Sequence, residues 1–438
     1  MHDIRPLFIH IPASAVLMLS MCLTVTCEAQ TVEPFASRSE QAPRLPTPLR
    51  LSNVAAIALQ NRAEITAARA RADALSQRPA IVSSLEDPMI SAAIDHYPFR
   101  GMMDSGRRYD RSISVEQKIP LSAILFHRRS AALADAARAR ALVGVTELDV
   151  LLNAQRAFFM LLERRKMRPV IDEQITMASL LVDVAASRYA SGGGAQADIL
   201  RAEAEVARLK SKRQSLDVQI RGAEAMLNAG LGLPVDEAVP ALQYSPSLGE
   251  PAPIPDVLDL AEARPELAAG AAEVKRASAD TRAMRSMYKP MATIKAGYAE
   301  TMAEGPGAML MVGISVPIWR RRLSSGVAEA QAMQRMADAG LEAMRRMVAG
   351  EALAARQEVV AAQVQVKLLR EDVMPRLKLA MDAALGSYSS GRGSLLASVE
   401  AAGALWQAQG EEVMAQSALG EAWSKLERAT GAGPQGQP

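Results

Sequence analysis

Residues that commonly carry catalysis are scarce in this chain of 438 residues. It has four histidines and two cysteines, and it contains no His-Glu-x-x-His metalloprotease motif, no phosphate-binding Gly-x4-Gly-Lys-Ser/Thr loop and no Gly-x-Ser-x-Gly nucleophile turn. Both cysteines, Cys22 and Cys27, lie in the N-terminal apolar segment, so the remainder offers no thiolate for a metal or a disulfide. We therefore expect neither enzyme activity nor a cofactor.

Methionine is the one residue type whose chemistry stands out. Thioethers suit soft monovalent ions such as Cu(I) and Ag(I). Nine of the 23 methionines lie in or near segments with strand-like alternation: Met89, Met102, Met103, Met284, Met287, Met291, Met302, Met309 and Met311. Successive residues of a strand point to opposite sides. If residues 308–317 form a membrane strand whose Leu310 faces lipid, Met309 and Met311 face the lumen and become candidate metal contacts. The alternative is that methionine is an adaptable filler among Ala-rich helices and barrel walls.

Four segments of about ten residues contain or flank these methionines. They alternate polar and apolar residues with a period of two, over residues 88–98, 109–119, 290–300 and 308–317. Their length and alternation are typical of transmembrane β-strands. Aromatic residues near the strand ends are candidates for a girdle at the membrane surface: Tyr97, Phe99, Tyr109, Tyr298 and Trp319. A half-buried sheet in a soluble domain is the alternative.

Four strands are too few to close a barrel, and open sheet edges are not tolerated in lipid. Three copies of the chain supply twelve strands, so trimerisation follows as a prediction. The chain outside the N-terminal segment has no apolar run of eighteen residues.

The rest of the chain favours long helices. Apolar residues make up 49% of the whole chain and aromatic residues only 4%, a composition that suits Ala-rich helices better than a compact core. Leu121–Tyr189 predicts a helix roughly 100 Å long, and residues 324–385 predict a second. A half-length helix follows each of these (195–229 and 394–428), and another precedes each strand pair (51–75 and 257–287). A soluble coiled coil is the alternative for the long helices.

The two halves of the chain repeat each other. Tyr-x-x-Gly occurs at Tyr189 and again 199 positions later at Tyr388, and each time it breaks a long helical pattern. The strand-end sequences "KIPLS" and "SVPIW", and the earlier "NRAEITAARA" and "RPELAAG", keep nearly the same offset. Landmarks that stay in register indicate an internal duplication.

The predicted organisation follows from these landmarks. Residues 1–29 are typical of a secretory signal peptide, with lipidation of Cys27 as the alternative, and residues 30–50 form an extended leader. The first repeat spans 51–229 with a helical hairpin tip at about 189–196. A Pro/Gly-rich linker, 230–256, leads to the second repeat, 257–429, with a tip at about 388–395. A disordered tail occupies 430–438.

In order and spacing these motifs, together with "DILRAEAE" and "SVEAAGAL" after the glycine breaks, resemble the TolC family of outer-membrane efflux proteins. The resemblance implies an α+β membrane protein: an α-helical barrel in the periplasm joined to a transmembrane β-barrel, with four strands per chain and twelve in a homotrimer. It also implies the outer membrane of a Gram-negative bacterium as the location. The implied partners are a periplasmic adaptor protein and an inner-membrane RND-type pump, with no nucleic acid.

The resemblance implies sites at the glycine breaks, which would be the periplasmic tips. Asp198 and Glu400 match acidic family positions at the periplasmic gate, whereas Ala397 departs from the usual acid. A solvated helix face for Glu400 and helix-start electrostatics for Asp198 are the alternatives. We expect Arg188, Gly192, Gly391 and Arg392 to contact the adaptor, although the glycines could serve only the turns.

The function implied is passive conduction through the outer-membrane channel of a tripartite efflux system. The resemblance leans toward heavy-metal efflux members, with copper or silver as cargo. The alternatives are a multidrug or small-organic duct of the same fold, protein secretion, and a soluble periplasmic coiled-coil adaptor.

Overall fold

The computed structural model describes residues 45–95, 110–245, 248–301 and 304–431. Several predictions fall outside these residues: the signal peptide, Cys27 and most of the leader, the girdle candidates Tyr97, Phe99 and Tyr109, and the tail beyond residue 431. Met102, Met103 and Met302 also lie outside the described residues.

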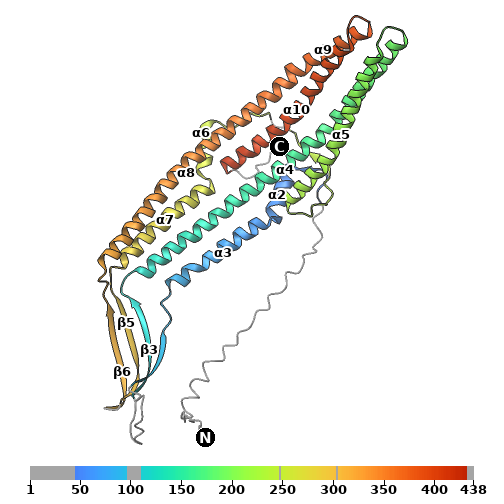
Figure 1. Ribbon diagram of the computed structural model, residues 1–438. Coiled ribbons are helices and arrows are strands. Elements are labelled where there is room, and N and C mark those ends of the chain that lie inside the picture. The colour runs from blue at the N-terminus through green and yellow to red at the C-terminus, as the bar shows by residue number, and fades with distance from the viewer. Residues whose placement is uncertain (1–44, 96–109, 246–247, 302–303, 432–438) are drawn as a thin grey trace, which may run out of the picture. The chain divides into compact units, whose positions relative to one another are not determined.

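Two sets of elements in the same order make up the described chain (Figure 1). The first comprises β1 (Leu49–Arg50), α2 (Leu51–Asn61), α3 (Ala63–Ser83), β2 (Met89–Asp95), β3 (Asp110–Pro120), α4 (Ile124–Ala190) and α5 (Gln196–Leu231). The second comprises β4 (Leu242–Gln243), α6 (Ile254–Glu262), α7 (Pro265–Ser286), β5 (Met291–Thr301), β6 (Gly305–Ser315), α8 (Arg320–Leu368), a π-helical turn (Leu369–Val373), α9 (Met374–Ser389) and α10 (Leu395–Thr430).

Strands from both repeats form one antiparallel sheet in the order β2-β3-β5-β6. The register sets two faces apart, as two neighbouring rows across the sheet show. One row joins Ile90, Val115, Ala296 and Leu310, and the neighbouring row on the opposite face joins Ser91, Ser114, Gly297 and Met309. We call these the apolar face and the polar face of the sheet.

The helices follow the order of the strands to which they connect. α3 packs on α4, α4 on α7 and α7 on α8 (Figure 1), so the sheet order β2-β3-β5-β6 is repeated in the helices that lead into or out of each strand. Short connections between strand and helix enforce this correspondence. Among the described residues, no helix combines the length and apolar character of a membrane span.

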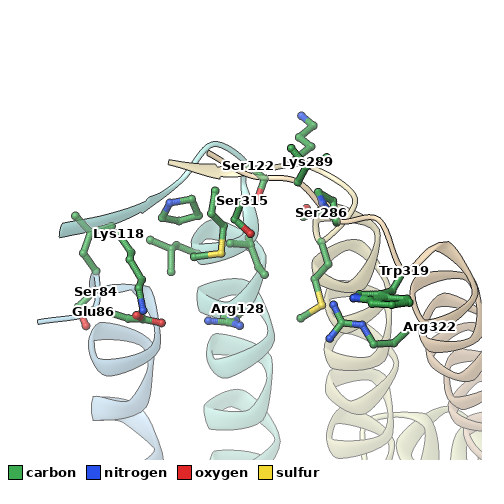
Figure 2. Close-up of a pocket in the computed structure, with 18 residues that line it drawn as sticks. Ser84, Glu86, Lys118, Ser122, Arg128, Ser286, Lys289, Ser315, Trp319 and Arg322 are labelled. Atoms are coloured by element: carbon green, nitrogen blue, oxygen red, sulfur yellow. The ribbon is translucent and has the colours of Figure 1, made fainter. Parts of the chain in front are cut away.

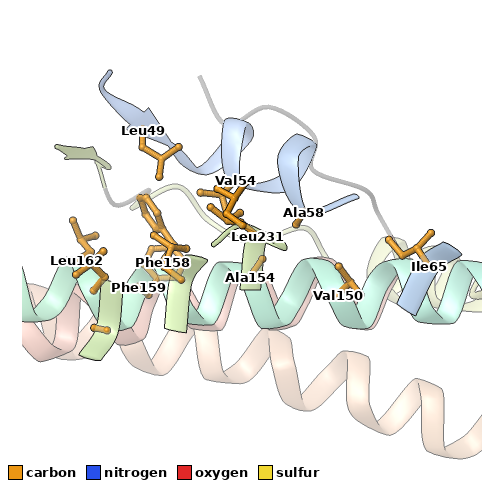
Figure 3. Packing of buried hydrophobic residues seen from close by; sticks show 14 residues of the cluster. Leu49, Val54, Ala58, Ile65, Val150, Ala154, Phe158, Phe159, Leu162 and Leu231 are labelled. Atoms are coloured by element: carbon orange, nitrogen blue, oxygen red, sulfur yellow. The ribbon is translucent and has the colours of Figure 1, made fainter. Parts of the chain in front are cut away.

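Three separate hydrophobic clusters hold the helices together. In the first, shown in Figure 3, Phe158 and Phe159 of α4 are fully buried under α2 and α5. Gly420 on α10 makes room for this cluster, because a Cβ atom there would overlap the Phe159 ring. A few aromatic rings therefore form the hydrophobic core here, in a chain whose helices are otherwise rich in alanine.

The helix predicted over 51–75 is broken in two, which corrects that expectation. Arg62 has extended backbone angles (φ −73°, ψ 122°) between α2 and α3. Its guanidinium donates to the carbonyl oxygen of Ala229 at 2.6 Å and pairs with Glu64 at 2.5 Å. The arginine thus adds a second donor to the carbonyl of Ala229, which also accepts from the backbone N–H of Gly232 at the end of α5.

The helix predicted over 257–287 is broken at the equivalent place. Arg264 is extended (φ −61°, ψ 141°) because Pro265 follows it and disfavours the helical conformation at the preceding residue. Its buried guanidinium pairs with Glu266 and with Glu351 of α8, both at 2.7 Å. The two repeats therefore share an Arg-x-Glu break whose arginine contacts a neighbouring helix, α5 in the first repeat and α8 in the second.

The second long helix is also not continuous. A π-helical turn, Leu369–Val373, separates α8 from α9, whereas α4 runs unbroken through 67 residues. Pro375 lies two residues beyond this turn and has no N–H to donate. A wider turn at this point lets the helix pass the proline.

Residues 242–244 of the linker pack against the first repeat. β4 pairs in parallel with β1, and Leu49 is fully buried. Tyr244 stands edge-on to Phe159 with ring centroids 4.8 Å apart.

Candidate functional site

Both hairpin tips have the same backbone. α4 ends at Ala190 before α5 begins, and α9 ends at Ser389 before α10 begins (Figure 1). Gly192 and Gly391 have φ of +75° and +78°, which is the left-handed region where glycine alone carries no penalty. One backbone bond of 2.9 Å closes each turn, from Gly193 to Arg188 and from Arg392 to Ser387.

Arg188 joins the two tips. One nitrogen of its guanidinium donates to the backbone oxygen of Tyr388 at 2.8 Å, and another donates to the backbone oxygen of Gly193 at 2.7 Å. The guanidinium also lies over the Tyr388 ring, 4.5 Å from its centroid. A Cβ atom on Gly391 would lie 3.6 Å from the same guanidinium. A single side chain of the first hairpin therefore holds the end of the second.

Asp198 takes part in the same cluster. The hydroxyl of Tyr388 donates to its carboxylate at 3.4 Å, a long hydrogen bond. Desolvation of the ring, followed by the negative charge of Asp198, raises the pKa of Tyr388 above its usual value. Asp198 also lies in the first turn of α5, where a helix favours negative charge.

The structure does not bring Glu400 and Arg392 into this cluster. Glu400 is exposed on α10, and none of the ion pairs found among the described residues involves it. Arg392 is exposed, and within the described chain its guanidinium donates only to the hydroxyl of Ser390, at 3.3 Å. Ala397 supplies a backbone N–H to the capping hydroxyl of Ser394.

Tyr388 is the residue that sequence reasoning missed as a site residue. Its side chain is only 1% exposed, while Tyr189, at the equivalent place in the first tip, is 49% exposed. The Tyr-x-x-Gly pattern marked both tyrosines as landmarks, but nothing in the pattern distinguishes the buried one from the exposed one.

The strand face carries the other candidates. Met309 and Met311 lie on the polar face, and Met311 shares a row with Lys295, Glu116 and Met89. The described residues contain no group of three His, Cys, Asp or Glu side chains that could hold a metal.

Comparisons with known proteins agree with the fold described above. Residues 258–432, which span most of the second repeat, match the model of a family described as outer membrane efflux protein. Its members are outer-membrane channels that reach into the periplasm, and the predicted location is confirmed. No curated protein matches the chain.

Solved structures share the fold of this chain. The outer-membrane channel OprN is 17% identical, with 88% of this chain and 91% of that chain covered at a TM-score of 0.76. VceC of Vibrio cholerae is 16% identical, with 87% and 96% covered at a TM-score of 0.74. CusC is 13% identical, with 87% and 91% covered at a TM-score of 0.75. The predicted TolC-like fold class is therefore confirmed.

Proposed function

We propose that the protein is the outer-membrane duct of a tripartite efflux system and conducts its cargo passively as a homotrimer. The observation that carries this proposal is the sheet. β2 and β6 are its edges and run antiparallel to one another, so β6 of one copy can pair with β2 of the next. Lipid requires every backbone edge to be paired, and three copies in this head-to-tail arrangement close the ring.

The two faces of the sheet support the same proposal. Large side chains on the apolar face are exposed, including Ile90, Leu310 and Ile314 at 72%, 74% and 63%. On the polar face the hydroxyls of Ser91 and Ser114 hydrogen-bond at 2.9 Å. In a closed ring the apolar face meets lipid and the polar face lines the passage.

The hairpin tips are the proposed periplasmic mouth. Asp198 and Glu400 are the proposed gate residues, and Arg188, Gly192, Gly391 and Arg392 are the proposed contacts for a periplasmic adaptor that links the duct to an RND-type pump. The contacts of Arg188 give it a second task, because its guanidinium already holds both tips of one chain together.

Soft metal ions, Cu(I) or Ag(I), are the proposed cargo. The supporting observation is that Met89, Met309 and Met311 all lie on the polar face, where thioethers would meet the contents of the passage. Small organic molecules are the second candidate cargo, for which these methionines would be wall material only. A periplasmic adaptor is a poorer match, because the exposed apolar face of the sheet needs lipid to cover it.

Two measurements test the proposal. Membrane fractionation should recover the protein in the outer membrane as a trimer that heating dissociates. A deletion strain, compared with its complemented control, should lose resistance to copper and silver but not to zinc, cadmium or drugs. Sensitivity to drugs alone would refute the metal cargo, and a monomer in the soluble periplasm would refute the duct.

A further inference from the structure

A cavity of about 490 Å³ lies where the sheet meets the helices (Figure 2). Its lining comes from all four junctions between strand and helix: α3 to β2, β3 to α4, α7 to β5 and β6 to α8. The strand residues that line it include Lys118, Met291 and Ser315, which belong to the polar face. The cavity is therefore on the side of the sheet that the proposed function assigns to the passage.

Positive charge dominates this cavity. Lys118, Arg128, Lys289 and Arg322 line it, with Glu86 as the only carboxylate of the lining. None of the four cations forms an ion pair in the part of the chain that the structure describes. Four serines also line the cavity. Figure 2 shows the side chains of Arg128 and Arg322 beneath the strands, whereas Lys289 points away from them.

A neighbouring groove shows that the excess of unpaired positive charge is particular to this cavity. The groove between α3, α4 and α7 is also lined by Arg128, but its other two arginines have carboxylate partners. Arg78 pairs with Asp135 at 3.5 Å, and Arg276 pairs with Asp280 at 3.3 Å. The same helices therefore neutralise their cations a few turns away and leave them unpaired at the junction.

We infer that this cavity is an anion-binding site that takes the carboxylate, phosphate or sulfonate group of a solute in the passage. Guanidinium groups and hydroxyls are the donors that oxyanions require. Rings of arginine and lysine in pores select anions, and a trimer would place three such cavities at one level of the duct. The inference rests on the proposed function, because it requires the polar face to line the passage.

The site also constrains the cargo. A bare metal cation would meet repulsion at this level, because unpaired like charges oppose its passage. Cu(I) and Ag(I) form anionic complexes with chloride and with thiolates. Soft-metal cargo would therefore pass the junction in such a complex rather than as a free ion.

Binding of pyranine, a trisulfonated dye, to the purified full-length protein in detergent tests the site. All four arginines at positions 128, 129, 321 and 322 are exposed. The double substitution R128Q/R322Q removes two guanidinium groups from the lining, and R129Q/R321Q removes two from adjacent positions that do not line the cavity. We expect saturable binding that weakens with salt. R128Q/R322Q should weaken it by about tenfold or more, since hydrogen bonds to charged groups are lost, while R129Q/R321Q should leave it unchanged.

Ion selectivity gives an independent reading in planar bilayers under a KCl gradient. The wild-type duct should pass chloride in preference to potassium, and R128Q/R322Q should lower that ratio by about threefold. Equal dye binding by both double variants, or a cation-selective wild type, would overturn the anion site. Dye binding without any conducting channel would leave the site standing and refute the duct.

Discussion

The two hairpin tips share a backbone and differ in what their side chains do. Both turns place glycine at nearly the same positive φ and close with the same backbone bond. Arg188 of the first tip has Ser387 as its counterpart in the second, and Tyr388 of the second is buried where Tyr189 of the first is exposed. The two tips have thus kept the same turn, but their side chains have diverged. Arg188 of the first tip now donates a hydrogen bond to the backbone of Tyr388 in the second.

The largest expected effect comes from removing the acceptor. Tyr388→Ala should cost about 3–5 kcal/mol of local stability in α9 and α10, because a buried aromatic ring leaves a cavity. Hydrogen exchange of the amides near the second tip measures this loss. The matched variant, Tyr189→Ala, should change exchange by less than about 0.5 kcal/mol, since its ring is half exposed. Equal effects of the two variants would mean that the tips are equivalent after all.

Removing the donor should cost less. Arg188→Ala loses two charge-assisted hydrogen bonds and a cation–π contact at a half-buried position, or about 2 kcal/mol. Exchange protection should fall in both tips, although only the first carries the substitution. Ser387→Ala, at the counterpart position, serves as the control. A loss confined to the first tip would contradict the role of Arg188 as a tie between hairpins.

The shared backbone predicts equal costs at the two glycines. Gly192→Ala and Gly391→Ala should each destabilise their own tip by about 1 kcal/mol, because both residues have left-handed angles. A Cβ atom has open space at Gly192 and only an ordinary contact with Arg188 at Gly391. Proteolysis rates at each tip can compare the two. A much larger effect at Gly391 would show that the turn geometry is not the common cost.

The smallest effect concerns pH. The pKa of Tyr388 is raised in the folded tip by desolvation and by Asp198, so the folded state holds its proton more tightly than the unfolded chain. This contribution is fully present below about pH 10, the ordinary tyrosine pKa, and is lost as the pH rises through the folded value. Tyr388→Phe should reduce the loss of protection in alkali, by a few tenths of a kcal/mol at most. An unchanged alkaline profile would exclude Tyr388 as the titrating group.

Local patterns determined much of this protein. Period-two alternation around Leu310 predicted strands, because successive residues of a strand point to opposite faces. The glycines after Tyr189 and Tyr388 predicted where the long helices end, because only glycine adopts positive φ without cost. Both inferences depend only on residues that are adjacent in the chain, so they can be drawn from the sequence alone.

Tertiary structure alone decided the rest. The breaks at Arg62 and Arg264 depend on partners in other helices, and the tie from Arg188 spans 200 positions to Tyr388. The sheet order likewise brings Lys118 and Arg322 of different repeats to one cavity. The sequence by itself determined the elements and their duplication, since these follow from local sterics and periodicity. Packing between distant segments decides which tyrosine is buried and which cations stay unpaired. A local sequence pattern cannot predict either outcome.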